Sequence, residues 1–186
     1  SQNLGNLDYG VYDKFGSYLD GKLLIDGKPT LKNGASSYWN FHKDDFDEKE
    51  RLLPFSSRFL LNRVDPSEVA FGTRHVYLST QAKLDEAAGK SEATPLTSVS
   101  DTLAAVTAMA YGTKTDQEYG TYAMIAGTGP RYSDSTDGGL YFSRDIRGDK
   151  KLSAANDYSG KTPSSIVFDA DTWKRFYVAD GETVWK

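Results

Sequence analysis

One segment pattern occurs three times in this chain of 186 residues, and it constrains the fold more than any single residue does. Each copy has a hydrophobic run, a polar turn, a second run ending in a small residue, another turn, and a third run carrying an aromatic residue near its end. The copies extend over Ser57–Thr80, Ala105–Asp145 and Ser164–Lys186. If Gly72, Gly127 and Asp180 are equivalent, the copies are about 55 and 53 residues apart, a period typical of repeated small sheets.

The runs within the copies have the composition of short strands. In the first copy, aliphatic and aromatic residues form runs that are bounded by turn residues and are too short for ordinary helices, at Leu60–Leu61, Val69–Phe71 and Val76–Leu78. In the second copy, small residues alternate through Val106–Ala110, which predicts an inner strand in a crowded part of the fold.

Charge and composition exclude several classes of protein. The net charge is −4 and the basic residues are scattered, so the chain lacks the basic patch that nucleic acid or an anionic membrane would require. Cysteine is absent, which removes disulfides, thiol catalysis and cysteine metal sites. A cysteine-free chain rich in tyrosine, glycine and aspartate favours an exported bacterial protein, so we expect a secreted or cell-surface location. No apolar stretch approaches the roughly 20 residues of a membrane helix, and no membrane insertion is expected.

Residues 1–55 lack the repeat pattern and are interpreted as a variable N-terminal segment with short strands. Asp20-Gly21 and Asp26-Gly27 lie between alternating runs, where Asp-Gly predicts hairpin turns. The charged stretch His42–Arg51 is expected to be a solvated loop or a short helix. Within the repeats, Gln81–Lys90 has local helix preference, but it contains a single leucine and is interpreted as a loop.

The copies resemble blades of Asp-box, or BNR-type, β-propellers, which occur in sialidases, sortilin-like receptors, xyloglucanases and exported bacterial proteins. That family's pattern is a strand, an Asp-Pro-type turn, a strand ending near Gly-Thr, a strand ending in Tyr or Trp, and then Ser-x-Asp-x-Gly-x-x-Trp. The resemblance covers about residues 58–186 and rests on Val64-Asp65-Pro66, Ala70-Phe71-Gly72-Thr73, Ile125-Ala126-Gly127-Thr128 and Val178-Ala179-Asp180-Gly181.

The box motif itself is degenerate in this chain. Ser143-Arg144-Asp145 keeps the serine and the aspartate, but neither the glycine nor the tryptophan follows in register. Ser79-Thr80-Gln81 lacks the aspartate, and Ser135-Thr136-Asp137-Gly138-Gly139 has suitable letters but precedes the third strand. The resemblance implies a structural turn at the box, in which serine and aspartate bond backbone groups, so the box identifies no catalytic residue.

The connection Thr128–Gly139 in the middle copy is longer than the repeat requires, which is where such scaffolds place recognition. The resemblance implies that this connection lies on the rim that forms the pocket mouth. Tyrosine offers a flat face to a sugar ring, and arginine and aspartate can bond hydroxyl groups. We therefore predict a ligand site at Arg131, Tyr132, Asp134 and Asp137, with a plain solvated loop as the alternative. Calcium at the same loop stays open, but the spacing of a calcium loop is missing, so no metal and no cofactor is predicted.

No catalytic set emerges from the sequence. A sialidase would carry an Arg-Ile-Pro segment, and a serine triad would carry Gly-x-Ser-x-Gly; neither occurs. His42 and His75 lie in different settings, and His75 is expected to be a surface strand residue rather than a zinc ligand or base. A xyloglucanase-like hydrolase needs two carboxylates about 5–10 Å apart. Turn formation is instead expected for the strand-end aspartates Asp65, Asp101, Asp145, Asp169 and Asp171.

These patterns predict an all-β fold: a β-propeller or part of one, built from small antiparallel sheets of about four strands. Residues 56–186 would form about three blades with the last one truncated. Closed propellers have about four to eight blades. The chain is therefore a fragment, or residues 1–55 contribute part of another blade, or several chains close the ring.

For function, we expect a noncatalytic extracellular recognition or scaffold module that binds a glycan or protein ligand. The alternative is a fragment of a propeller glycoside hydrolase whose catalytic carboxylates lie partly outside this chain, and a third possibility is a structural spacer. Other propeller blades or domains of a larger protein are expected partners, and nucleic acid is not. Buried, facing carboxylates of raised pKa would indicate the hydrolase, whereas aspartates engaged in turns would indicate the scaffold.

Overall fold

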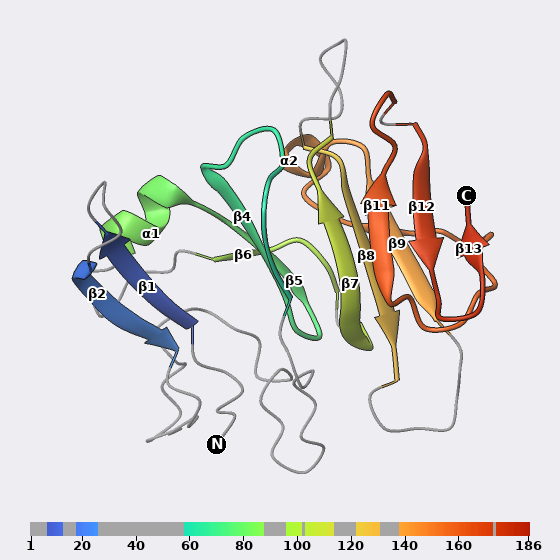
Figure 1. Cartoon of the computed structure of the whole chain (residues 1–186), viewed down its shortest axis with the longest axis horizontal. Helices are drawn as coiled ribbons and strands as arrows, with labels where there is room; N and C mark the ends of the chain where they lie inside the picture. The colour runs from blue at the N-terminus through green and yellow to red at the C-terminus, as the bar shows by residue number, and fades with distance from the viewer. Residues whose placement is uncertain are drawn as a thin grey trace.

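A computed structural model describes residues 7–12, 18–25, 58–87, 96–101, 103–113, 122–130, 138–172 and 174–186. Within these residues the chain is mostly β, with small antiparallel sheets of three or four strands that follow one another in chain order (Figure 1). The all-β expectation and the expected size of the sheets are confirmed, while the sheets do not close on themselves. None of the helices in the described part is long and apolar enough to cross a membrane.

The N-terminal segment contributes a separate pair of strands. β1 (Leu7–Tyr12) pairs antiparallel with β2 (Tyr18–Ile25), so the expected short strands are present. The turn prediction at Asp20-Gly21 is wrong, because these residues lie inside β2 opposite Val11 and Gly10. Strand-forming apolar residues on both sides of this dipeptide, Tyr18-Leu19 and Leu23-Leu24-Ile25, allow the strand to continue through it. Asp26-Gly27 and His42–Arg51 lie outside the described residues.

The first repeated sheet has the order β3-β4-β5-β6. Its strands are β3 (Arg58–Leu61), β4 (Glu68–Gly72), β5 (Val76–Thr80) and β6 (Thr97–Ser98). Between β5 and β6 the chain forms helix α1 (Gln81–Ala87), so the loop interpretation of Gln81–Lys90 is wrong for these seven residues, while residues 88–90 lie outside the described ones. A helix this short is marginally stable by itself, and two contacts stabilise it. Thr80 Oγ1 accepts a bond of 3.2 Å from the Lys83 amide, and Leu84 is buried.

The second sheet has the order β7-β8-β9-β10 and is the best buried. It contains β7 (Ala105–Tyr111), β8 (Met124–Gly129), β9 (Gly139–Ser143) and β10 (Ser153–Ala154), with the short helix α2 (Ile146–Asp149) between the last two strands. The expected strand at Val106–Ala110 is present as β7, which is buried along almost its whole length. The third sheet contains β11 (Ser165–Phe168), β12 (Phe176–Ala179) and β13 (Val184–Trp185).

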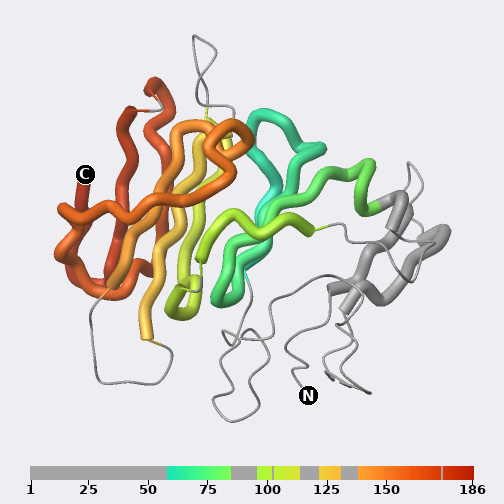
Figure 2. Tube along the Cα trace, turned by 180° about the vertical axis from the view of Figure 1, so that it is seen from behind, coloured from blue at the N-terminus to red at the C-terminus, as the bar shows by residue number. Residues whose placement is uncertain are grey.

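The three sheets pack face to face, with the second sheet in the middle, as Figures 1 and 2 show from opposite sides. One apolar cluster joins the first two sheets and includes Ala70, Leu78 and Val106. Another joins the second and third sheets and includes Ala108, Ile125 and Ile166. β7 contacts β3 and β4, while β11 contacts β7 and β8, so each junction is centred on a first strand.

Glycine allows this close approach at both junctions. A Cβ atom on Gly72 would lie 2.7 Å from Val106 Cγ1, and a Cβ atom on Gly127 would lie 2.5 Å from Pro163 Cβ. Both distances are shorter than nonbonded carbon contacts allow. The equivalence of Gly72 and Gly127 therefore has a packing reason.

The hairpin bonds correct the third position of the repeat. The Thr73 amide donates to the His75 carbonyl, and the Asp180 amide donates to the Thr183 carbonyl. Asp180 therefore corresponds to Thr73, and Ala179 corresponds to Gly72 and Gly127. The sequence suggested Asp180 because Val178-Ala179-Asp180-Gly181 aligns position by position with Ile125-Ala126-Gly127-Thr128.

Antiparallel strand order separates the connections into two rims. We call one the turn rim; it includes residues 62–67 between β3 and β4, helices α1 and α2, and residues 169–175. The other, the loop rim, includes residues 73–75, the ends of the β8–β9 connection at 130 and 138, residues 155–164 and residues 180–183.

Candidate functional site

Aspartates on the turn rim use their oxygens to hold turns. Asp65 Oδ1 accepts bonds from the Ser67 amide at 3.2 Å and the Ser67 hydroxyl at 2.6 Å. The hydroxyl bond is the largest reason why the pKa of Asp65 lies below its ordinary value. A carboxylate held charged in this way is suited to fixing a turn and not to donating a proton.

Asp169 likewise holds the corresponding turn of the third sheet, between β11 and β12. Its Oδ1 accepts a bond of 2.9 Å from the Asp171 amide, and its Oδ2 accepts one of 3.2 Å from the Tyr177 hydroxyl. The Asp171 amide is the first cause that holds the pKa of Asp169 below its ordinary value, and Arg175 adds its positive charge. The predicted turn role is confirmed for Asp65 and Asp169.

The degenerate box occupies the turn between β9 and β10, where the resemblance would place it. Ser143 Oγ donates to Asp149 Oδ2 at 2.6 Å and accepts from the Asp145 amide at 3.1 Å. Asp145 Oδ1 accepts a bond of 3.2 Å from the Gly148 amide and caps α2. Ser143 and Asp145 therefore hold the turn by bonding backbone amides and the Asp149 carboxylate. Such a structural role is what the sequence predicts for these two residues.

Two residues depart from the box pattern in an informative way. The box glycine would fall at position 147 and the tryptophan at 150, which are Arg147 and Lys150 here. Lys150 takes the left-handed conformation that ends α2, with φ of 54°. Arg147 projects from α2 toward the first sheet, which a glycine could not do.

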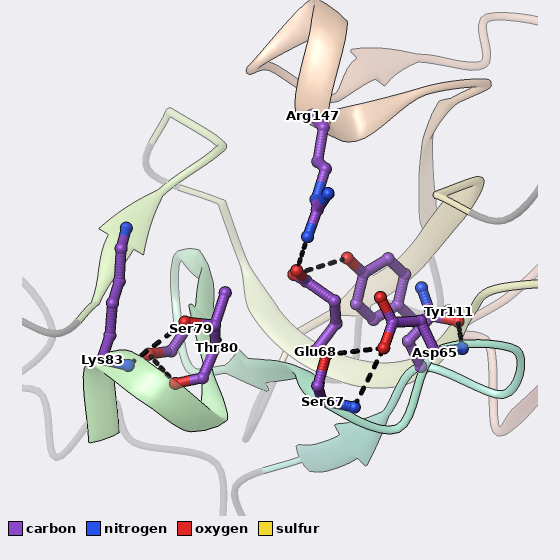
Figure 3. Close-up of polar contacts among 9 residues, drawn as sticks. Asp65, Ser67, Glu68, Ser79, Thr80, Lys83, Tyr111 and Arg147 are labelled. Atoms are coloured by element: carbon purple, nitrogen blue, oxygen red, sulfur yellow. Dashed lines mark hydrogen bonds and ion pairs between the residues drawn. The ribbon is translucent and has the colours of Figure 1, made fainter. Parts of the chain in front are cut away.

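Arg147 meets a buried carboxylate there (Figure 3). It forms an ion pair with Glu68, whose side chain is only 4% exposed. The guanidinium also lies 4.1 Å from the centre of the Tyr122 ring. Tyr111 donates a long bond of 3.4 Å to the other Glu68 oxygen, and burial raises the pKa of Tyr111 to about 12. The four side chains tie the first sheet to the second at the turn rim.

Sequence reasoning missed this cluster. Glu68 has the position of an ordinary strand residue, and nothing in the repeat indicates that it is buried. The available signal was Arg147 itself, because a long cation at the box glycine position implies a partner across the turn. The group contains one carboxylate that is already paired, so it is a structural cross-link and not an acid–base pair.

Among the described residues, Asp180 is the most heavily bonded carboxylate of the loop rim. Its Oδ2 accepts from Trp185 Nε1 at 2.8 Å and from the Lys161 amide at 3.0 Å, and its Oδ1 accepts from the Thr183 amide at 2.8 Å. The Trp185 bond is the largest cause that holds the pKa of Asp180 well below its ordinary value. Asp180 fastens the β12–β13 turn to the segment that leads into β11.

The predicted ligand residues Arg131, Tyr132, Asp134 and Asp137 lie outside the described residues. Their flanks are described and pack tightly on the loop rim. The Gly138 amide donates to the Gly160 carbonyl at 3.3 Å, and a Cβ atom on Gly129 would lie 2.2 Å from Thr162 Oγ1. Both ends of the predicted loop are thus held against residues 160–163.

The other candidate residues have no joint site. Asp101 is exposed and pairs with Lys151 at 2.7 Å, and Asp171 is exposed on the β11–β12 turn. His75 is buried against the Tyr77 ring, so its expected surface position is wrong; the short Thr73–His75 turn brings it inward. His42 lies outside the described residues. Among the residues that the structure describes, no three metal-ligating side chains lie together.

No protein-family model matches the chain, and no curated protein or solved structure is detectably similar to it.

Proposed function

We propose that the chain is a noncatalytic extracellular recognition or scaffold module of β-propeller type, exported by a bacterium, that binds a glycan or a protein ligand. The observation that carries this proposal is the use of the strand-end aspartates. Asp65, Asp145, Asp169 and Asp180 each accept a backbone amide bond within or beside their own turn. These carboxylates act as parts of the scaffold.

The direction of the pKa shifts supports the noncatalytic part of the proposal. A glycosidase acid needs a carboxyl group whose pKa is raised by an apolar or negative environment. Hydrogen bonds from amide and hydroxyl donors lower the pKa of Asp65, Asp169 and Asp180 instead. At neutral pH these groups are charged and cannot donate a proton to a leaving group.

The packing supports the propeller part. Three antiparallel sheets follow one another along the chain, their first strands β3, β7 and β11 lie in contact order, and the sheets stack face to face. The turn at Ser143–Asp145 lies between a third and a fourth strand, which is the place of the box in the family that the sequence resembles.

The proposed ligand surface is the β8–β9 connection on the loop rim, with Arg131, Tyr132, Asp134 and Asp137 as the contacting residues. Support comes from its flanks: the buried strand β8 and the contacts of Gly129 and Gly138 with residues 160–163 provide a fixed base. A rigid base reduces the entropy that a binding loop loses when its ligand docks.

A glycan array on the full chain tests the ligand assignment. We expect one glycan class to bind the wild type and to lose at least tenfold in affinity with the double variant Arg131→Ala, Tyr132→Ala. The matched control is Arg144→Ala, which removes an exposed arginine from the turn rim and should leave binding unchanged. Equal affinity of the double variant and the wild type would contradict the assignment.

A further inference from the structure

First strands use their second residue to enter the preceding sheet. In β11 the second and fourth residues, Ile166 and Phe168, face the second sheet and are 6% and 8% exposed. In β7 the second residue, Val106, packs against Gly72 of the first sheet and is fully buried. A first strand therefore presents apolar knobs to the sheet before it.

The first sheet has the same knobs, but they are exposed. Phe59 and Leu61 are the second and fourth residues of β3 and are 47% and 53% exposed. Leu60, between them, packs against the cluster shared with β7. Because side chains alternate along a strand, Phe59 and Leu61 point away from the second sheet. On the same face of the sheet, Val69 and Phe71 of β4 and Tyr77 of β5 are buried. The exposed apolar part of this face is therefore a strip along β3.

The third sheet has a receiving face that is also exposed. Ile166, Phe168 and Val178 pack on the second sheet, so Val167 and its neighbours point the other way. Val167 is 53% exposed and lies opposite Tyr177 in the pairing, while Val184 is 68% exposed and lies opposite Ala179. Ala179 holds the position at which Gly72 and Gly127 receive the knobs of the next sheet.

We propose that a second copy of this chain docks head to tail, with the β3 strip of one copy against the outer face of β11–β13 of the other. Phe59 would then lie near Ala179 as Val106 lies near Gly72 and Ile166 near Gly127, at a wider spacing because alanine adds a Cβ atom. Both surfaces belong to the same chain, and the described junctions are centred on first strands, so contact along β3 continues an interface that the molecule already uses twice. The proposal rests on the repeated-sheet part of the proposed function.

The contact is heterologous, because two different surfaces of the chain meet, and this property allows a sharp test. Sedimentation of the wild-type chain should show species larger than 20.5 kDa as its concentration rises to about 1 mM, where a contact of about 4 kcal/mol is half formed. Leu61→Asp removes the strip, Val167→Asp removes the receiving face, and each variant alone should sediment as a monomer, with association weakened at least tenfold.

A mixture of the two variants should form a dimer and nothing larger. The Val167→Asp chain keeps its strip, and the Leu61→Asp chain keeps its receiving face, so one intact contact remains. Recovery of binding also shows that both variants are folded. The matched control is Phe142→Asp, an apolar residue of similar exposure on the middle sheet, which should associate like the wild type.

Three results would overturn the proposal: a wild type that stays monomeric throughout, either single variant associating like the wild type, or a mixture that fails to form the dimer. None of these results would affect glycan binding by the β8–β9 connection, which is measured separately at low concentration.

Discussion

The two junctions between neighbouring sheets share one device and differ in another. At both, a glycine of a second strand receives the first strand of the next sheet, Gly72 at the first junction and Gly127 at the second. The side-chain fastenings differ. The first junction has the ion pair between Glu68 and Arg147 at the turn rim. The second has Thr107 Oγ1, which donates to the Pro163 carbonyl at 2.6 Å, at the loop rim.

The comparison separates the glycine contact, which occurs at both junctions, from the polar side-chain contacts, which differ between them. Close packing at a residue without a side chain sets the spacing of the sheets at both described junctions. The polar fastening can be placed on either rim and can be made by an ion pair or by a bond to backbone. A glycine at position 147 would have no side chain to make this cross-link.

Alanine at the two glycines should have the largest effect and separates the junctions. The Gly127→Ala methyl would meet the stiff ring of Pro163, whereas the Gly72→Ala methyl would meet Val106 and the flexible end of Met109. Overpacking typically costs about 1–3 kcal/mol. We expect Gly127→Ala near the upper end and Gly72→Ala near the lower end, measured by urea unfolding. Equal losses would show that the neighbouring residue does not decide the cost.

Removing Arg147 tests the fastening that only the first junction has. Arg147→Ala leaves Glu68 buried without its partner, and we expect a loss of about 2 kcal/mol in the free energy of unfolding, reduced from the fully buried case because Arg147 is half exposed. Glu68→Gln in the same chain should recover part of the loss, since the buried charge is then gone. A double variant no more stable than Arg147→Ala would contradict the ion-pair interpretation.

Tyr111 gives the first junction an alkaline signature. Its pKa is raised to about 12 by burial, so its contribution to stability is complete below its ordinary value of 10.0 and is lost as the pH rises from 10 toward 12. We expect a loss of about 2 kcal/mol in the wild type, since one pKa unit corresponds to about 1.4 kcal/mol. Tyr111→Phe should not show it. The check is the difference in unfolding free energy between the two proteins from pH 9 to pH 12.

Asp180 gives the third sheet an acid signature, and we expect the smallest effect there because the turn is exposed. Its pKa lies well below the ordinary 3.8, so the stability that it contributes is present above that value and is lost as the pH falls below it. Asp180→Asn should be less stable than the wild type at pH 6, and the gap should narrow in acid. Thermal melts of both proteins at pH 6 and pH 3 would show a constant gap if the carboxylate charge were unimportant.

The sequence predicts the strands well because apolar runs, turns and the repeat period are local signals. β7 was recognisable from the small residues of Val106–Ala110, and the turn roles of Asp65 and Asp169 followed from their position after a strand. Nonlocal contacts were not predictable. The burial of Glu68, the reach of Arg147 and the inward position of His75 depend on a neighbouring sheet or turn that no local pattern specifies.

The central claim is that the strand-end aspartates serve the scaffold and that the chain binds without catalysis. The most direct measurement is mass spectrometry of a bound glycan after long incubation with the wild type and with Asp65→Asn, Asp145→Asn and Asp169→Asn variants. The account predicts intact glycan with every protein, and lower melting temperatures for the variants. Release of sugar by the wild type that any one of these substitutions abolishes would contradict it.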